Sequence, residues 1–104
     1  MAGDSIRIRT RVEDDVVEVK ALISHPMETG IRHDASGAPI PAHYIRELVC
    51  RHNGEVVMRA YWGTGIARNP YIAFRFRGGA PGDALSLGWT DNRGDSDTLE
   101  TVLS

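Results

Sequence analysis

Apolar and polar residues alternate along most of the chain, and a period of two is typical of half-buried β-strands. The alternating segments are short, and turn-forming residues separate them. They cover residues 6–11, 17–23, 45–52, 55–62, 71–77, 85–90 and 97–103. No segment shows the helical period of about 3.6 residues. We therefore predict an all-β fold, an antiparallel β-sandwich of about seven strands.

The Asn53-Gly54 pair predicts a tight hairpin between two of these segments, because both residues tolerate the positive φ angles of a type I′ turn. A two-residue loop places Val49 opposite Met58. The face on which this pair lies is apolar and is expected to be core. Its members are Ile45, Val49, Val56, Met58, Ala60 and Trp62.

The opposite face of the same hairpin is apolar in the middle and polar at its ends. An exposed apolar strip with arginine and tyrosine at its rim has the composition of a protein interface. The alternative is a loop folded over the strip. The candidate partner-binding residues are Leu48, Cys50, Val57, Arg59 and Tyr61.

Length and charge limit the function classes. A chain of 104 residues is expected to form a single domain, residues 1–104. A net charge of −2 does not favour nucleic-acid binding. No apolar run is long enough for a membrane span, and the first residues lack the apolar region of a signal peptide, which by itself favours the cytoplasm.

Candidate chemistry is sparse. The single cysteine, Cys50, excludes disulfides and multi-cysteine zinc sites. A thiol enzyme would need Cys50 activated by a base, and His52 lies two strand residues away, a long reach of roughly 7 Å. A copper site could use His25, Met27 and His33. These patterns favour a binding module without metal or cofactor over an enzyme.

The segment after residue 23 is expected to be a surface loop, because Pro26 cannot donate a strand hydrogen bond. Loops held on a rigid sandwich often carry function. The alternative is that Met27 fills one end of the sandwich. The candidate functional residues of this loop are His25, Pro26, Met27, Glu28 and Gly30.

The ten-residue string of residues 21–30, ALISHPMETG, resembles the signature loop of the SoxZ family. Further matching residues follow in the same order, so the likeness covers roughly residues 6–103. They are Arg32, Asp34-Ala35, Gly37, Ile40-Pro41, Ile45, Cys50, Asn53-Gly54, Asn69-Pro70-Tyr71 and Trp89-Thr90-Asp91.

This resemblance implies an immunoglobulin-like sandwich that pairs with SoxY, in the SoxYZ sulfur carrier complex of thiosulfate oxidation. SoxY carries sulfur intermediates on the cysteine of a C-terminal Gly-Gly-Cys-Gly-Gly tail, and SoxZ is not a catalyst. Cys50 lies between Val49 and Arg51, so this chain does not match the sulfur-bearing subunit. A small periplasmic copper-binding sandwich protein is the alternative function.

The resemblance also implies partners and a compartment. The carrier contacts a haem protein that attaches thiosulfate, a sulfate-releasing hydrolase and a sulfur dehydrogenase. SoxZ is exported to the periplasm with its signal-bearing partner, which replaces the cytoplasmic expectation. Arginines such as Arg32, Arg75 or Arg77 could attract anionic sulfur species.

Overall fold

Seven antiparallel strands form the protein in a computed structural model that describes residues 3–104. There is no helix among these residues, and so none that could cross a membrane. The strands are β1 (Ile6–Glu13), β2 (Val16–Ile23), β3 (Ile45–His52), β4 (Glu55–Tyr61), β5 (Tyr71–Arg77), β6 (Ala84–Asp91) and β7 (Ser96–Val102). The predicted all-β fold with about seven strands is confirmed.

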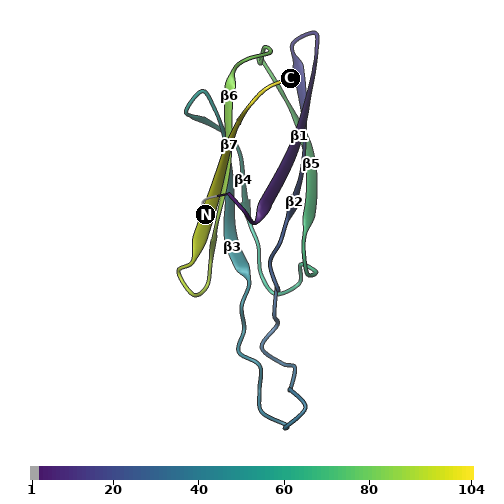
Figure 1. Ribbon diagram of the computed structural model, residues 1–104, viewed down its shortest axis with the longest axis vertical. Helices are drawn as coiled ribbons and strands as arrows, with labels where there is room; N and C mark the ends of the chain where they lie inside the picture. The colour runs from purple at the N-terminus through teal and green to yellow at the C-terminus, as the bar shows by residue number, and fades with distance from the viewer. Residues whose placement is uncertain (1–2) are drawn as a thin grey trace.

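The strands lie in two sheets that face each other (Figure 1). One sheet has the order β1-β2-β5 and the other β4-β3-β6-β7. Alternate residues of β2 and β6 point between the sheets; for example, Val17, Val19, Leu85 and Leu87 are at most 1% exposed. The core therefore fills the space between two half-apolar sheets, as in immunoglobulin-like sandwiches.

The hairpin at Asn53-Gly54 is present, but its predicted register holds only next to the turn. His52 pairs with Glu55, and Arg51 pairs with Val56. Beyond that point one extra residue, Val57, bulges from β4 and shifts every later pair. Because successive strand residues face opposite sides, a shift of one residue reverses which side chains of β4 accompany those of β3.

A second irregularity lies in β3 itself, between Ile45 and Glu47, where β3 pairs with β6. It allows both Ile45 and Leu48 to point inward, and each is 0% exposed. The prediction of Ile45 as core is confirmed. The prediction of Val49 as core is wrong, because Val49 lines the outer surface of the sheet.

The predicted exposed strip is wrong for Leu48 and Cys50, which are 0% exposed and belong to the core. Val57 is half-buried against that core. Arg59 and Tyr61 are exposed, and they pair with Val49 and Glu47 on the outward side of the sheet. Val56, expected in the core, is 44% exposed.

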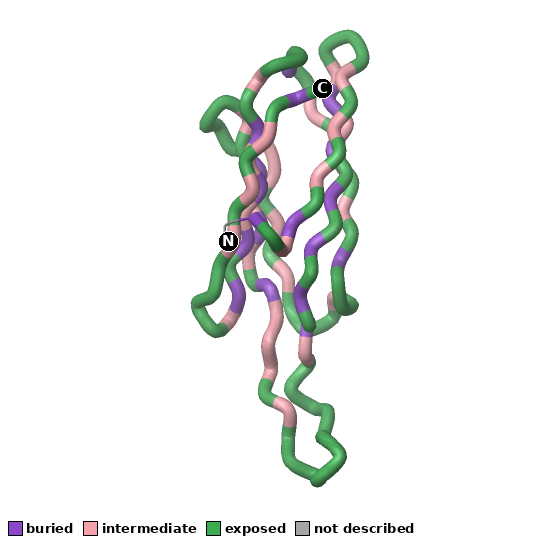
Figure 2. Tube along the Cα trace, viewed as in Figure 1, coloured by how far each residue is buried: buried purple, intermediate pink, exposed green. Residues whose placement is uncertain are grey.

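Residues 24–44 form a long loop between β2 and β3 that projects beyond the ends of the strands (Figure 1). Two isolated bridges, Glu28 with His43 and His33 with Pro39, hold it as an irregular ribbon. At the tip, Oδ1 of Asp34 accepts hydrogen bonds from the amides of Ser36 and Ala38. The loop lengthens the molecule to 54 × 24 × 18 Å, and its tip is exposed (Figure 2).

Candidate functional site

A buried cluster of His25, His43 and Asp91 lies where the projecting loop leaves the sandwich. His25 follows β2, His43 precedes β3, and Asp91 ends β6. Nε2 of His25 is 3.0 Å from Oδ2 of Asp91, and Nε2 of His43 is 2.7 Å from the same oxygen. The side chains of His25 and Asp91 are 2% and 0% exposed. One carboxylate oxygen of the four-stranded sheet thus holds both ends of the loop, the end that leaves β2 of the opposite sheet and the end that enters β3 of its own sheet.

A backbone hydrogen bond fixes the tautomer of the His25 ring. Its Nδ1 accepts a hydrogen bond from the backbone N–H of Met27 at 3.1 Å, so in the neutral ring the proton is on Nε2 and points to Asp91. Met27 itself has a positive φ of 48°, which is uncommon for a residue with a side chain. Its Sδ lies 3.3 Å from the backbone N of Ile45, and it is 5% exposed. Met27 therefore fills the end of the sandwich, as the alternative interpretation expected.

The second oxygen of Asp91 is equally occupied. Oδ1 accepts hydrogen bonds from the amides of Arg93 and Asp95, both at 3.0 Å, inside the β6–β7 turn. Burial by itself raises the pKa of the Asp91 carboxyl, but the hydrogen bonds from His25, His43 and the two amides together outweigh burial and hold that pKa below its ordinary 3.8. Asp91 is thus an ionised, fully hydrogen-bonded anchor.

The cluster has ligand types for a metal, since its three ligand atoms lie within 4.8 Å of one another. Their present bonds do not fit one. Nε2 of His25 could coordinate only after losing its proton to Nδ1, and that would break the bond from the buried Met27 amide. Of the three residues named for copper, His33 is exposed near the loop tip and bridges Pro39 instead.

Cys50 is not placed for nucleophilic chemistry. It is 0% exposed, and burial raises the pKa of its thiol to about 12. The ring of His52 is directed elsewhere, with Nε2 lying 2.8 Å from Oδ2 of Asp83. A protonated, sealed thiol is inert toward sulfur substrates.

The signature loop divides into an anchored base and an exposed tip. His25 and Met27 are buried in the base, while Pro26 and Gly30 are exposed. Glu28 forms a bidentate ion pair with Arg32, and the guanidinium of Arg32 lowers the pKa of the Glu28 carboxyl. Ile31, which lies between these two residues in the chain, is 80% exposed. The part available for contact is therefore the outer part of the loop, from Ile31 to the tip, and not the histidine or the methionine of the motif.

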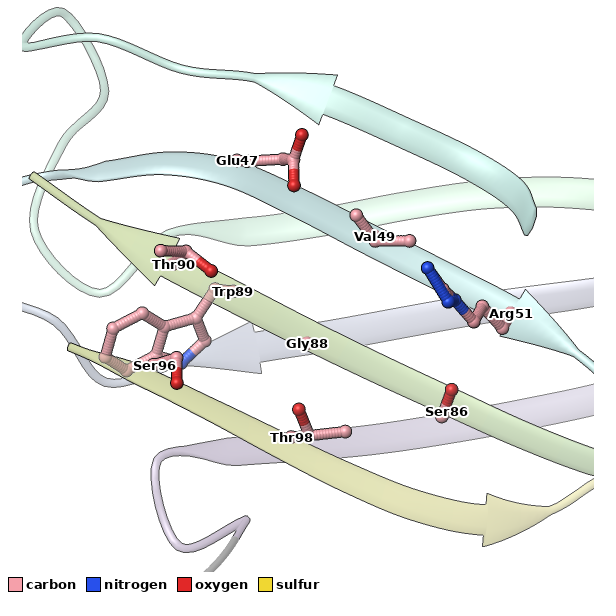
Figure 3. Close-up of a pocket in the computed structure, with 9 residues that line it drawn as sticks. All are labelled: Glu47, Val49, Arg51, Ser86, Gly88, Trp89, Thr90, Ser96 and Thr98. Carbon is pink, nitrogen blue, oxygen red and sulfur yellow. The ribbon is translucent and has the colours of Figure 1, made fainter. Parts of the chain in front are cut away.

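A shallow cavity of about 320 Å³ lies on the outward surface of β3, β6 and β7 (Figure 3). We call it the Gly88 groove. Its floor is made of small residues, and a Cβ added at Gly88 would lie 2.8 Å from Oγ1 of Thr98. The lining residues are Glu47, Val49, Arg51, Ser86, Gly88, Trp89, Thr90, Ser96 and Thr98.

The charges of the Gly88 groove balance, with one acidic and one basic side chain, Glu47 and Arg51. Glu47 is further neutralised by Arg59, whose Nη1 is 2.9 Å from its Oε2. Hollow sheet faces with little charge are suited to packing against another protein, since interface cores are depleted in charge. The sequence analysis did not identify this surface, although Ser86, Gly88 and Thr90 alternate with large apolar residues in the sequence.

The comparisons with known proteins fit this architecture. The profile of the family "Sulphur oxidation protein SoxZ" matches residues 6–102. No curated protein sequence is significantly similar. A hypothetical protein from Pyrococcus horikoshii OT3 superposes with a TM-score of 0.66 at 19% identity, over 95% of this chain and 87% of that chain.

Two superoxide reductase structures share the same fold. One, in the oxidised state, gives a TM-score of 0.65 at 19% identity and covers 95% of this chain and 86% of that chain. The reduced neelaredoxin from Archaeoglobus fulgidus gives a TM-score of 0.60 at 25% identity, over 95% and 86% of the two chains. What these likenesses establish is the sandwich fold.

Proposed function

Because the chain belongs to the SoxZ family of sulfur oxidation proteins, we propose that it is the non-catalytic subunit of a sulfur carrier complex. It pairs with a SoxY-type subunit, whose C-terminal cysteine carries the covalent sulfur intermediates of thiosulfate oxidation. It helps to present that cysteine to the Sox enzymes. The compartment in this proposal is the periplasm, reached together with the signal-bearing partner.

The observation that carries the pairing is the Gly88 groove. A stable protein interface needs a surface whose desolvation costs little free energy. The surface of the Gly88 groove is hollow and nearly balanced in charge. Two residues of the earlier candidate interface, Arg59 and Tyr61, border the same outward surface from β4. Tyr61 is 75% exposed, and tyrosine contributes strongly to interfaces. Val57, the third of these candidates, is packed against the core at the bulge and adds little to this surface.

The buried thiol of Cys50 supports separate roles for the two subunits, with the sulfur carried by the partner alone. Cys50 is sealed in the core with its pKa raised to about 12, so it does not compete with the partner's cysteine for sulfur. The projecting loop is anchored by Asp91 at its base and exposed at its tip. A rigid sandwich with an anchored projection fits a scaffold better than a reacting centre.

Filling the groove tests the proposal. Gly88→Leu places a side chain across its floor, and Ser86→Leu fills it from a neighbouring position of β6. Ala73→Leu adds the same group to the outward surface of the other sheet and serves as the control. Each variant is co-expressed with the SoxY-type subunit, and complex formation is measured by size-exclusion chromatography.

We expect both groove variants to weaken the complex by at least about tenfold, because a misfitted side chain at an interface core costs more than about 1.4 kcal/mol. Ala73→Leu should pair normally. Thermal unfolding of each free variant separates lost binding from lost folding. Normal pairing by two folded groove variants would place the interface elsewhere, and absence of any complex with the unaltered chain would refute the pairing.

A further inference from the structure

A second cavity, of about 450 Å³, lies at the end of the four-stranded sheet where the projecting loop enters β3. Three of its lining side chains are aromatic: Tyr44, which precedes β3, and Tyr61 and Trp62, at the end of β4. Small-molecule sites have volumes of this order and are lined mainly by apolar and aromatic side chains. We call this site the aromatic cavity.

An irregularity in β3 places a basic side chain beside these rings. Arg46 and Glu47 are consecutive in the strand, yet both line the aromatic cavity. Successive strand residues normally point to opposite faces of a sheet. Here Ile45 and Glu47 both have partners in β6, and Arg46 between them has none. Such an extra residue redirects a side chain, and in this strand it brings the guanidinium of Arg46 to the cavity.

The positive charge of Arg46 is not neutralised within the protein. Among residues 3–104, no carboxylate forms an ion pair with Arg46. The neighbouring carboxylate of Glu47 is bound by Arg59 instead, with Nη1 2.9 Å from Oε2. The aromatic cavity therefore offers one arginine to an external anion.

Backbone hydrogen bonds hold two walls of the cavity in place. The backbone N–H of Trp62 donates to the carbonyl oxygen of Arg46 at 2.9 Å, which continues the pairing of β3 with β4 beyond Tyr61. On the other side, the N–H of Tyr44 donates to Oδ1 of Asn92 at 2.8 Å, and the N–H of Asn92 donates to the Tyr44 carbonyl at 3.0 Å. A preformed site of this kind loses little conformational entropy when a ligand binds.

We propose that the aromatic cavity is a binding site for a small aromatic carboxylate. The planar guanidinium fork of Arg46 matches the geometry of a carboxylate. The rings of Tyr61 and Trp62 provide apolar faces and edges against which a flat ring packs. This site goes beyond the proposed function and does not depend on the partner subunit. It adjoins the Gly88 groove, with which it shares Glu47 and Thr90, so binding is measured on the chain alone.

The test titrates the full chain with naphthoate, a flat carboxylate, and follows the amide of Gly63 and the indole of Trp62 by NMR. Two other compounds separate the parts of the ligand. Naphthalenemethanol has a neutral hydroxyl group in place of the carboxylate, and acetate has the carboxylate without the rings. Arg46→Gln removes the charge from the cavity, and Arg68→Gln, at an exposed position outside it, is the control.

A second pair of variants tests the location of the site. Gly63→Leu adds a side chain to the wall of the cavity, and Gly65→Leu adds the same side chain outside it. A Cβ added at either glycine meets no atom within 4 Å, and neither residue has a positive φ, so both variants should fold. The amide spectrum of each variant verifies its fold.

We expect naphthoate to bind with a Kd of about 1 mM or below and to shift the signals of Gly63 and Trp62. Naphthalenemethanol and acetate should bind about tenfold more weakly or worse, because each lacks one of the two contacts. Arg46→Gln and Gly63→Leu should weaken naphthoate binding by a similar factor, while Arg68→Gln and Gly65→Leu bind it normally.

Three results would overturn the proposal. The first is the absence of any shift at about 5 mM naphthoate. The second is equal affinity for naphthoate and its neutral counterpart. The third is unchanged naphthoate binding by folded Arg46→Gln or by folded Gly63→Leu.

Discussion

Oδ2 of Asp91 lies 3.0 Å from Nε2 of His25, and this contact connects the end of β6 to the end of β2 across the sandwich. These two strands belong to different sheets. His43 adds a second bond to the same oxygen from the other end of the loop. The base of the projecting loop is therefore held by one carboxylate in addition to the backbone bridge between Glu28 and His43.

Replacing this carboxylate should loosen the loop and weaken the fold. In Asp91→Asn, one of the two oxygens becomes an NH₂ group, which cannot accept from the histidines or from the amides of Arg93 and Asp95. Leaving buried donors without acceptors should lower the free energy of unfolding by about 2–4 kcal/mol. Urea unfolding measures this change.

The matched control is Asp95→Asn, an exposed carboxyl in the same turn. It should change stability by less than about 0.5 kcal/mol. Similar effects of the two substitutions would show that Asp91 does not anchor the loop.

Acid should destabilise the protein through the same group. The folded-state pKa of Asp91 is lowered, because its hydrogen bonds outweigh the opposing effect of burial. The unfolded chain therefore binds a proton near the ordinary pKa of 3.8 while the folded chain stays ionised. The stabilisation is present above about pH 4 and is lost as pH falls through the lowered pKa.

The free energy of unfolding, followed from about pH 6 to about pH 3, should fall less steeply in Asp91→Asn than in the unaltered chain. Some slope will remain, because the pKa of Asp97 is also lowered: hydrogen bonds from Ser5 and nearby amides outweigh its burial. Identical slopes in the two proteins would contradict the role given to Asp91.

The thiol of Cys50 should resist alkylation in the folded protein. Burial protects it and raises its pKa to about 12, so almost no thiolate is present at neutral pH. Iodoacetamide at pH 8 should modify it only at the rate of unfolding, and rapidly in denaturant. Fast modification of the native protein would show that the thiol of Cys50 is reactive.

Zinc and copper should not stabilise the protein. The ligand atoms of His25, His43 and Asp91 are committed to one another and to backbone amides, so binding would cost those bonds. Melting temperature is the measurement, since a tightly bound metal raises it. A metal-dependent rise that His43→Gln removes would show that the cluster is a metal site.

Several features of this protein were accessible from the sequence. Alternation located all seven strands, and Asn53-Gly54 located the hairpin turn. The resemblance of residues 21–30 to the SoxZ signature loop is confirmed by the family match. These signals are local, and short segments of sequence are sufficient to encode them.

The faces of the central hairpin were not accessible, because two single-residue irregularities decide them. The bulge at Val57 shifts β4, and the one between Ile45 and Glu47 turns Leu48 inward. Both lie in segments whose sequence is typical of regular strands. Because side chains alternate between the two faces of a strand, one extra residue moves all later side chains to the opposite face. The prediction of Leu48 and Cys50 as exposed failed for this reason.

The histidine cluster was missed because its members are distant in sequence. Asp91 lies 66 residues from His25 and 48 from His43. In the sequence, Asp91 is the first residue of a turn-forming run. Its hydrogen bonds from the amides of Arg93 and Asp95 are those of a turn, so they give no sign of a second role. Its second role depends on two other chain segments meeting at one end of the sandwich.

The central claim is that this chain pairs with a sulfur-bearing subunit and carries no sulfur itself. Native and intact-mass spectrometry of the two proteins, co-purified from cells growing on thiosulfate, tests it most directly. We predict a complex with equal numbers of the two subunits, in which every sulfur-containing mass addition is on the partner and Cys50 is unmodified. Sulfur additions on this chain, or its purification without a partner, would contradict the account.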